Sequence, residues 1–299
     1  MLTASSFFEL AFFHWRVTNN YFCCFNVITM NLKSEQPIGI FDSGVGGLTV
    51  AGAIKRLLPE ENLIYFGDTA HLPYGDKSKE TITHYSERIT EYLLEKNCKI
   101  IVIACNTASA NAYESVLSLV EDRALVINVI DPVIDYVVSQ KTSGAIGVIG
   151  TKGTINSATY EKKLLGKNSG LKVVSMATPL FVPMIEEGFI YDDISNAIIR
   201  SYLSKEPLHN IDTLILGCTH YPIIKNQISR YYNFKVTVID SSSIVAQSLR
   251  DLLQKNRLNN KNNNVSCTFY VSDYTDYFKT ISKLFFEEDI ELEKLNFWS

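Results

Sequence analysis

The sequence predicts an α/β protein of the doubly wound type, built from two similar halves. Short runs rich in Ile and Val recur along the chain, and each is followed by a helix-like stretch. Unbroken apolar runs of this length are typical of strands covered on both faces, and such strands form parallel sheets joined by crossover helices. The runs lie at residues 38–41, 63–66, 100–104, 126–129, 145–149, 172–176, 213–216 and 235–239.

Internal sequence similarity indicates that the two halves correspond. Three segments of the first half match segments of the second: residues 38–44 on 146–152, residues 63–66 on 171–174, and residues 101–105 on 214–218. The first two matches alone could reflect the strand-loop-helix pattern that any two α/β domains share. The third match ends on Cys105 in one half and Cys218 in the other, which favours a duplicated domain.

These matches predict two α/β domains. The first comprises residues 37–130 plus 240–299, and the second comprises residues 131–239. The polar, Asn-rich segment 258–264 reads as a loop before a last strand at 267–271 and a closing helix from Tyr274.

Composition limits the classes of function. The chain has 299 residues, 46% of them hydrophobic, which is enough to form substantial cores. The balance of 28 basic against 32 acidic residues leaves no basic excess to neutralise a phosphate backbone, so nucleic acid is not expected as the primary substrate. No run approaches the roughly 18 consecutive apolar residues that span a bilayer, and no membrane partner is expected.

Residues 1–36 read as an N-terminal extension that is dispensable for the chemistry. The segment is rich in aromatic residues, but Glu9, His14 and Arg16 interrupt its apolar stretch, which argues against a secretory signal. A polar lead-in directly before the first strand starts at Met30, so residues 1–29 are predicted to lie upstream of the natural start.

The six cysteines are expected to be free thiols in the reducing cytoplasm. They show no clustered spacing and no export signal, so neither a disulfide framework nor an exported protein is predicted. There is no C-x-x-C pair, and Cys218 with His220 offers only two ligands, so no metal is predicted. Cys23, Cys24 and Cys267 have no motif around them and read as inert.

Two of the cysteines follow buried strands at equivalent positions. In a parallel sheet, ligands meet the carboxyl ends of the strands, where loops turn into helices. Cys105-Asn106-Thr107 opens a predicted helix, whose dipole favours a thiolate and whose N–H groups can hold a carboxylate. Cys218-Thr219-His220 repeats this pattern before Tyr221-Pro222. A lone cysteine is more often a buried core residue, but the pairing favours chemistry.

The first strand ends in a glycine-rich run, Asp42-Ser43-Gly44-Val45-Gly46-Gly47. Its glycines permit a tight turn close to a ligand, which also suits a phosphate-binding loop. The run matches neither phosphate-loop pattern, and Asp42 would repel a phosphate. The carboxylate is better suited to bind an ammonium group or to steer the proton of a neighbouring thiol. Pro73-Tyr74-Gly75, taken alone, reads as an ordinary turn.

Together these motifs make the chain resemble the bacterial glutamate racemases over about residues 37–285. The matching segments are residues 39–47, 65–68 with 72–75, 104–109, Gly150-Thr151 with Thr154, and 216–222. The resemblance implies a pseudo-symmetric pair of flavodoxin-like domains with the active site between them. It also implies L- and D-glutamate as substrates, supply of D-glutamate for peptidoglycan, and no pyridoxal phosphate, metal or other cofactor. A homodimer is compatible with it.

The resemblance also implies roles for individual residues. Cys105 and Cys218 would be the two acid/base groups, the first acting on D-glutamate and the second on L-glutamate. Asp42 would support the first thiol, and Glu186 and His220 the second. The substrate contacts implied or expected are Asp42, Ser43, Tyr74, Gly75, Asn106, Thr107, Thr151, Thr219 and His220. Thr178 stands where many relatives carry a Cys before the proline, here Pro179.

Racemisation at Cα needs one group to remove a proton from one face and another to deliver one to the opposite face. A thiol titrates closer to neutral pH than a lysine, and helix N-termini are expected to favour its thiolate further. Three alternatives stay open. One is a racemase of another acidic amino acid, whose members commonly carry Glu at the position of His220. The others are a non-catalytic amino-acid-binding module and a thiol hydrolase.

Overall fold

The computed structural model describes residues 32–140, 144–262, 264–286 and 288–298. Residues 32–299 form one compact unit. Most of the predicted extension, with Cys23 and Cys24, lies outside the described residues, so its dispensability stays a prediction.

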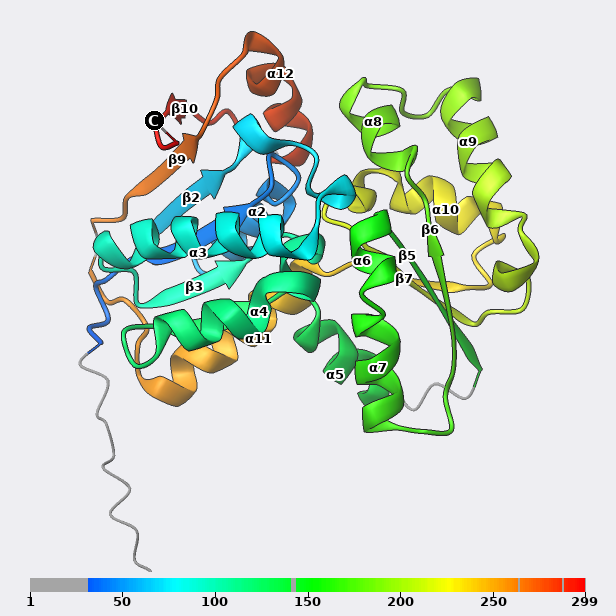
Figure 1. Cartoon of the computed structure of the whole chain (residues 1–299), viewed down its shortest axis with the longest axis horizontal. Helices are drawn as coiled ribbons and strands as arrows, with labels where there is room; N and C mark the ends of the chain where they lie inside the picture. The colour runs from blue at the N-terminus through cyan, green and yellow to red at the C-terminus, as the bar shows by residue number, and fades with distance from the viewer. Residues whose placement is uncertain (1–31, 141–143, 263, 287, 299) are drawn as a thin grey trace, which may run out of the picture. The chain divides into compact units, whose positions relative to one another are not determined.

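The described chain contains two parallel sheets (Figure 1). The six-stranded sheet has the order β10-β9-β2-β1-β3-β4, and the four-stranded sheet has the order β6-β5-β7-β8. The strands are β1 Ile38–Asp42, β2 Leu63–Gly67, β3 Ile100–Ile103, β4 Leu125–Asn128, β5 Ala145–Gly150, β6 Lys172–Ala177, β7 Thr213–Gly217, β8 Thr237–Ile239, β9 Cys267–Val271 and β10 Leu292–Lys294. The α/β fold class with parallel sheets is therefore confirmed.

The two sheets repeat one strand order. The order β2-β1-β3-β4 in the first sheet corresponds to β6-β5-β7-β8 in the second. The internal sequence matches pair β1 with β5, β2 with β6 and β3 with β7, and these pairs occupy equivalent positions in the two sheets. Every residue of β1, β3, β5 and β7 is buried, which explains why these strands read as continuous apolar runs.

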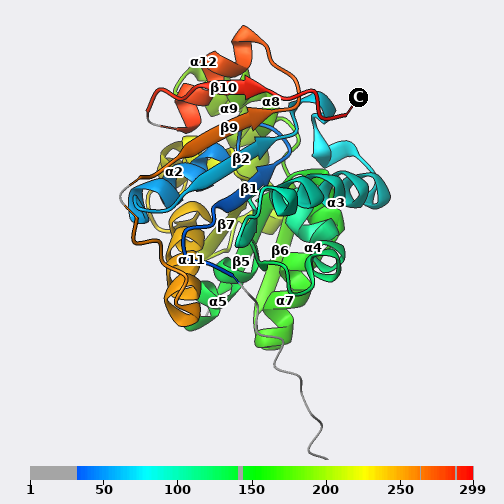
Figure 2. The same ribbon diagram turned by 90° about the vertical axis from the view of Figure 1, so that its left-hand side faces the viewer.

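Helices cover both faces of the first sheet. Figure 2 shows α2 and α11 on one side of it and α3 and α4 on the other. Helix α2 packs against α11, and α3 packs against α4. The helices are α2 Leu48–Leu57, α3 Lys79–Glu95, α4 Asn106–Val120, α5 Asp131–Ser139, α6 Lys152–Asn156, α7 Thr159–Lys167, α8 Phe181–Glu186, α9 Asp193–Leu203, α10 Lys225–Tyr231, α11 Ser242–Asn256 and α12 Asp276–Phe285.

The end of the chain differs from the prediction in two places. The strand at 267–271 is followed by a further one, β10, which pairs with β9. Only Leu292 of its three residues is buried, so no apolar run signals it. The closing helix begins at Asp276 rather than at Tyr274, because the Thr275 side chain accepts a hydrogen bond from Phe278 N and caps it.

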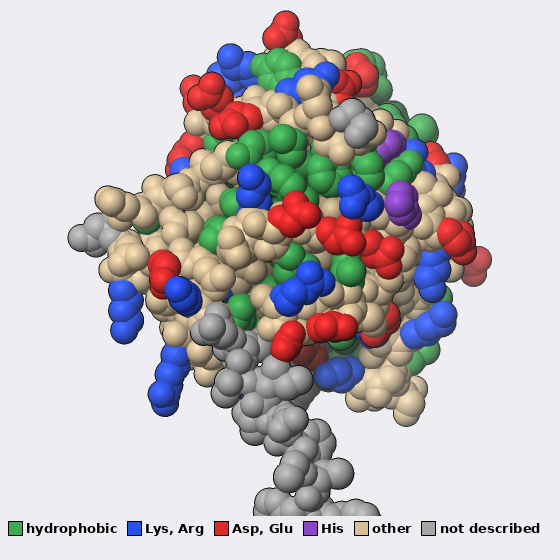
Figure 3. Space-filling view, turned by 60° about the vertical axis from the view of Figure 1, so that its left-hand side comes forward, with side chains coloured by type: hydrophobic (Ala, Val, Ile, Leu, Met, Phe, Trp, Pro, Cys, Tyr) green, Lys and Arg blue, Asp and Glu red, His purple; other side chains and the backbone are tan. Residues whose placement is uncertain are grey.

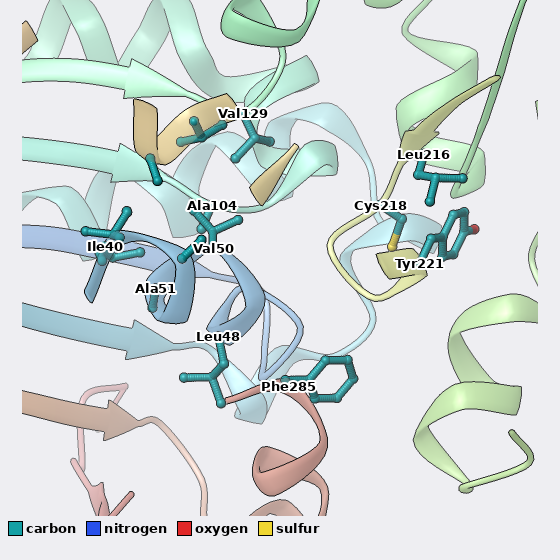
Figure 4. Packing of buried hydrophobic residues seen from close by; sticks show 14 of the residues in the cluster. Ile40, Leu48, Val50, Ala51, Ala104, Val129, Leu216, Cys218, Tyr221 and Phe285 are labelled. Atoms are coloured by element: carbon teal, nitrogen blue, oxygen red, sulfur yellow. The ribbon is translucent and has the colours of Figure 1, made fainter. Parts of the chain in front are cut away.

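The predicted division into two domains stays a prediction. The strands of the first sheet come from residues 38–128 and 267–294, and those of the second from residues 145–239. One apolar cluster contains Ile40 of β1 and Leu216 of β7, together with Leu48 of α2 and Tyr221 of the 3₁₀ helix after β7 (Figure 4). The described unit therefore has a core that continues from one sheet to the other.

Within the described residues, no helix is both long and apolar enough to cross a bilayer. On the face shown in Figure 3, basic and acidic side chains are interspersed and do not gather into regions of one sign.

Candidate active site

A pocket of about 270 Å³ lies where the strand ends of the two sheets meet. Its walls come from the segments that follow β1, β2, β3, β5, β6 and β7. The predicted site residues that line it are Ser43, Tyr74, Gly75, Cys105, Asn106, Thr107, Thr151, Glu186, Cys218, Thr219 and His220. The position predicted for the site, at the carboxyl edges of the strands, is therefore where the structure has a pocket.

Cys105 is the N-cap residue of α4. Its Sγ accepts a hydrogen bond from Ala108 N at 3.4 Å and lies 3.6 Å from Ser43 Oγ, to which the thiol can donate. The side chain is buried but lines the pocket. The first thiol is thus held by a helix terminus on one side and by the β1 loop on the other.

The protonation state of Cys105 is opposite to the expectation from the helix dipole. Burial, and after it the charge of Asp42, raises the pKa of this thiol to about 12. The Ala108 N–H and the Ser43 hydroxyl act the other way but are outweighed. Desolvation of a fully buried group exceeds what one helix terminus contributes. Cys105 is consequently a neutral thiol at physiological pH.

Asp42, the last residue of β1, does not line the pocket, although its charge acts on Cys105. Its Oδ2 accepts hydrogen bonds from Gly44 N and Gly47 N, both at 3.0 Å. Its Oδ1 is buried and has no hydrogen-bond partner among the described residues. Burial raises the pKa of this carboxyl, against the effect of His220 and of the backbone N–H groups. The position favours an action on the thiol over direct contact with a substrate.

Cys218 directly follows β7 and lines the same pocket as Cys105. Figure 4 shows it between Leu216 and Tyr221. The segment after it is a 3₁₀ turn, Tyr221–Ile224, and α10 begins only at Lys225. The predicted helix start at Tyr221-Pro222 is present, but it is a 3₁₀ helix with His220 at its N-cap that leads directly into α10, and Cys218 is not its N-cap residue. The positive charge near Cys218 comes from a side chain.

That side chain is His220. Its Nδ1 lies 3.8 Å from Cys218 Sγ, and its Nε2 lies 2.9 Å from Glu186 Oε1. Burial lowers the pKa of His220, but the interactions with Cys218 and Glu186 outweigh burial and raise the pKa to about 10. The ring is held edge-on against Phe285, with 5.0 Å between centroids. A fixed imidazolium therefore faces the second thiol at neutral pH.

Three threonine hydroxyls join the strand ends of the two sheets. Thr107 Oγ1 lies 2.8 Å from Thr151 Oγ1 and 3.3 Å from Thr154 Oγ1. Thr151 also caps α6, since its side chain accepts a hydrogen bond from Thr154 N at 3.2 Å. Gly75 packs directly on Thr151, where a Cβ would come within 2.8 Å. These contacts fix one side of the pocket.

Asn106 offers an unused donor at the pocket. Its Oδ1 accepts a hydrogen bond from Tyr160 OH at 2.7 Å, which orients the amide. Its Nδ2 is buried and has no hydrogen-bond partner among the described residues. A buried donor without a partner is costly, so this amide is suited to a ligand that accepts a hydrogen bond.

The pocket includes residues that the sequence analysis did not single out for it. They are Leu72, Pro73, Asp76, Lys152, Thr178, Pro179, Val182 and Pro183. Lys152 Nζ lies 3.1 Å from Asp76 Oδ1, so an exposed ion pair stands at the pocket. Several of these residues flank predicted site residues directly, and this adjacency is the signal by which they could have been found.

No group of three or more His, Cys, Asp or Glu side chains in the described part of the chain is arranged to hold a metal ion. Cys98, Cys105, Cys218 and Cys267 are free thiols.

Comparison with known proteins gives the class of the protein. The family model described as Asp/Glu/Hydantoin racemase matches residues 48–249. The glutamate racemase of Chlorobaculum parvum is 44% identical over 258 residues, which cover 85% of this chain and 93% of that protein. The glutamate racemase of Geobacter metallireducens is 44% identical over 223 residues, or 75% of this chain and 82% of that protein. The chain belongs to the Asp/Glu/Hydantoin racemase family, and it is an isomerase.

Solved structures agree on the particular branch of the family. The glutamate racemase of Francisella tularensis, in complex with D-glutamate, superposes with a TM-score of 0.84 at 39% identity and covers 89% of this chain and 99% of its own. The Thermus thermophilus glutamate racemase, in complex with beta-chloro-D-alanine, gives a TM-score of 0.79 at 34% identity, covering 88% and 98%. The resemblance to glutamate racemases is thereby confirmed.

Proposed function

We propose that this protein interconverts L-glutamate and D-glutamate by a two-thiol acid/base mechanism without a cofactor. The observation that carries the proposal is the pair of thiols in one pocket. Cys105 follows β3 and Cys218 follows β7, which occupy equivalent places in the two sheets. A substrate bound between them presents one face of Cα to each thiol.

The conversion of L-glutamate takes two proton transfers, one at each thiol. The Cys218 thiolate removes the α-proton and becomes a thiol, which leaves a carbanion at Cα. The Cys105 thiol then delivers its proton to the opposite face, which forms D-glutamate and leaves a thiolate on Cys105. The reaction of D-glutamate runs through the same states in the opposite order.

The electrostatics of the free enzyme support this assignment of roles. Cys105 is held as a neutral thiol, since burial and Asp42 raise its pKa to about 12. The His220 imidazolium, 3.8 Å from Cys218 Sγ, stabilises negative charge on the second thiol. The proton held on Cys105 and the positive charge of His220 beside Cys218 both support L-glutamate acting at Cys218.

The α-proton is very weakly acidic, so the site must also stabilise the negative charge that develops on the substrate. The unpartnered Asn106 Nδ2 is a donor suited to the α-carboxylate. The N–H groups of Asn106 and Thr107, the first two residues of α4, have no acceptor within the helix and lie at the same wall. Both donors are in place before the substrate arrives.

Glutamate is proposed as the substrate because the relatives compared above are glutamate racemases, one of them solved with D-glutamate. Purified protein is incubated with L-glutamate, with L-aspartate and with buffer alone, and the loss of optical activity is recorded. The proposal expects racemisation of glutamate and far slower racemisation of aspartate. Preference for aspartate would favour the alternative racemase, and no reaction with either would reject the proposal. We further propose that the D-glutamate serves peptidoglycan synthesis in the cytoplasm.

Gly46 is expected to be essential to the position of His220. A Cβ at this residue would lie 2.3 Å from His220 Cε1 and Nδ1, so Gly46→Ala must displace the imidazole. We expect a loss of kcat/KM of at least about 10-fold and a destabilisation of about 1–3 kcal/mol. Kinetics and thermal unfolding measure the two effects.

Gly166→Ala is the matched control, because this glycine in α7 has no atom within 4 Å of an added Cβ. It should leave kcat/KM unchanged and stabilise the protein by about 0.5–1 kcal/mol. Equal kinetics in the two variants would contradict the role given to Gly46.

Glu186→Gln is expected to move the pH dependence of turnover. The carboxylate at 2.9 Å helps to raise the pKa of His220 to about 10, and the neutral amide removes this support. The pKa of His220 falls, the imidazolium is lost at lower pH, and the alkaline limb of kcat/KM shifts to lower pH. An unshifted limb would count against His220 as the charge that supports Cys218.

The same pKa shift gives a sign for stability. A histidine whose pKa is raised in the folded state stabilises that state fully below its ordinary pKa of 6.5, and the contribution disappears as pH rises through about 10. The difference in unfolding free energy between the wild type and Glu186→Gln should therefore be largest near pH 6 and shrink towards pH 10.

A further inference from the structure

The C-terminal segment, residues 295–298, ends beside the loop that carries Tyr74 (Figure 2). Phe297 packs on Phe66, with ring centroids 4.8 Å apart. Trp298 contacts His71 at 4.7 Å and Tyr85 at 5.1 Å between centroids. The end of the chain is thus anchored on the β2–α3 connection by aromatic contacts.

A second kind of contact leads from this segment towards the pocket. Trp298 Nε1 donates a hydrogen bond of 2.7 Å to Asp68 Oδ1, across 230 positions of the sequence. Tyr74 OH donates a hydrogen bond of 2.7 Å to Asp68 Oδ2. Asp68 is fully buried, and Tyr74 lines the pocket. One carboxylate therefore connects the last described residue to a wall of the active site.

The carboxylate of Asp68 is held from several sides. Ser272 Oγ donates to Oδ1 at 2.8 Å, and His71 Nδ1 lies 3.0 Å from Oδ2. A buried carboxylate needs such donors, and the loss of one leaves an acceptor without its partner. Among these donors, the Trp298 N–H belongs to the C-terminal segment, so this hydrogen bond forms only when that segment is packed against the β2–α3 connection.

We propose that Asp68 is a positioning residue for the loop that carries Tyr74 and Gly75, and that Trp298 locks Asp68 in place. The Trp298 N–H fixes the carboxylate, the carboxylate fixes the Tyr74 hydroxyl, and the ring of Tyr74 then sets the position of Gly75 against Thr151. The inference rests on the proposed function, because it concerns the binding of glutamate in that site. Neither Asp68 nor Trp298 lines the pocket, so both act through Tyr74.

Trp298→Phe tests this lock, because phenylalanine keeps a packed ring and removes the N–H. The KM for glutamate is expected to rise about 10-fold with a smaller change in kcat, since one hydrogen bond to a charged group that orients a binding loop is lost. Phe297→Leu is the matched control. It weakens the same aromatic anchor without touching Asp68, and should lower the unfolding temperature while KM stays at the wild-type value.

A wild-type KM in Trp298→Phe, or an equal rise in KM in Phe297→Leu, would overturn the proposal. Tyr74→Phe supplies a second comparison, because it removes the other end of the connection. If the two hydrogen bonds act in series, the double variant Tyr74→Phe/Trp298→Phe should bind glutamate about as weakly as Tyr74→Phe alone. Fully multiplied effects would show that the two residues act independently.

Fluorescence gives a measurement that does not depend on turnover. The chain has two tryptophans, and Trp15→Phe in the full chain leaves Trp298 as the single tryptophan, which is excited at wavelengths that tyrosine does not absorb. Titration with D-glutamate is expected to change its emission with a midpoint close to KM, and unchanged emission at saturation would contradict the lock. A wild-type protein that does not racemise glutamate would instead reject the proposed function, so the two failures are distinguishable.

Discussion

Replacement of either Cys105 or Cys218 by alanine is expected to abolish net racemisation. One face of Cα then has no group to take or give a proton, and kcat should fall by about 100- to 10,000-fold or more. The fold should persist, because each thiol makes only long contacts, at 3.4 and 3.6 Å for Cys105 and 3.8 Å for Cys218. Turnover and thermal unfolding of both variants measure the two expectations.

Cys267→Ala is the control for the loss of a thiol. Cys267 is half-buried in β9 and does not line the pocket, so its replacement should leave kcat unchanged. Full racemisation by both Cys105→Ala and Cys218→Ala, or activity that depends on added pyridoxal phosphate or metal, would show that the two-thiol mechanism is wrong.

Asp42→Asn is expected to have the next largest effect on turnover. An asparagine oxygen can still accept from Gly44 N and Gly47 N, so the loop is kept and only the charge is removed. The charge of Asp42 helps to raise the pKa of Cys105, so its loss makes this thiol a weaker base towards D-glutamate. We expect kcat/KM to fall about 10- to 100-fold. The fall must be equal in both directions, because the equilibrium constant does not change.

Asp289→Asn is the control for the loss of a carboxylate, since Asp289 is exposed and paired with Lys283 at 2.6 Å. It should leave kcat/KM unchanged. Normal kinetics in Asp42→Asn would contradict the role of Asp42 beside the first thiol.

The parts of the fold that were predictable are those in which a local pattern has one physical solution. The apolar runs of β1, β3, β5 and β7 are buried on both faces, so their composition predicts parallel strands. The site followed from topology, because the ends of parallel strands gather at one edge. Two cysteines at equivalent strand ends were therefore predicted to share a site, and both line one pocket.

The protonation of Cys105 could not be predicted, because it depends on opposing effects on the pKa of the thiol. The motif shows a helix N-terminus, which favours the thiolate, but it does not show complete burial or the neighbouring charge of Asp42, which win. The type of helix that starts after Cys218 could not be predicted for a related reason. Pro222 suits the start of an α-helix and of a 3₁₀ turn equally, and tertiary packing decides between them.

Contacts between distant parts of the sequence could not be predicted either. The hydrogen bond from Trp298 to Asp68 joins residues with no shared motif, and β10 is too short to show a pattern. The three threonine hydroxyls that link the sheets read separately as helix caps and motif residues. Only the folded chain shows that they meet.

Exchange of the α-hydrogen in heavy water tests the central claim most directly. Cys105→Ala and Cys218→Ala are each incubated with L-glutamate and with D-glutamate, and deuterium at Cα is followed by NMR or mass spectrometry. The two-thiol account predicts slow exchange without inversion for one enantiomer in each variant, with opposite preferences: L-glutamate with Cys105→Ala and D-glutamate with Cys218→Ala. Exchange of both enantiomers by either variant, or the same preference in both, would contradict the placement of one thiol on each face of Cα.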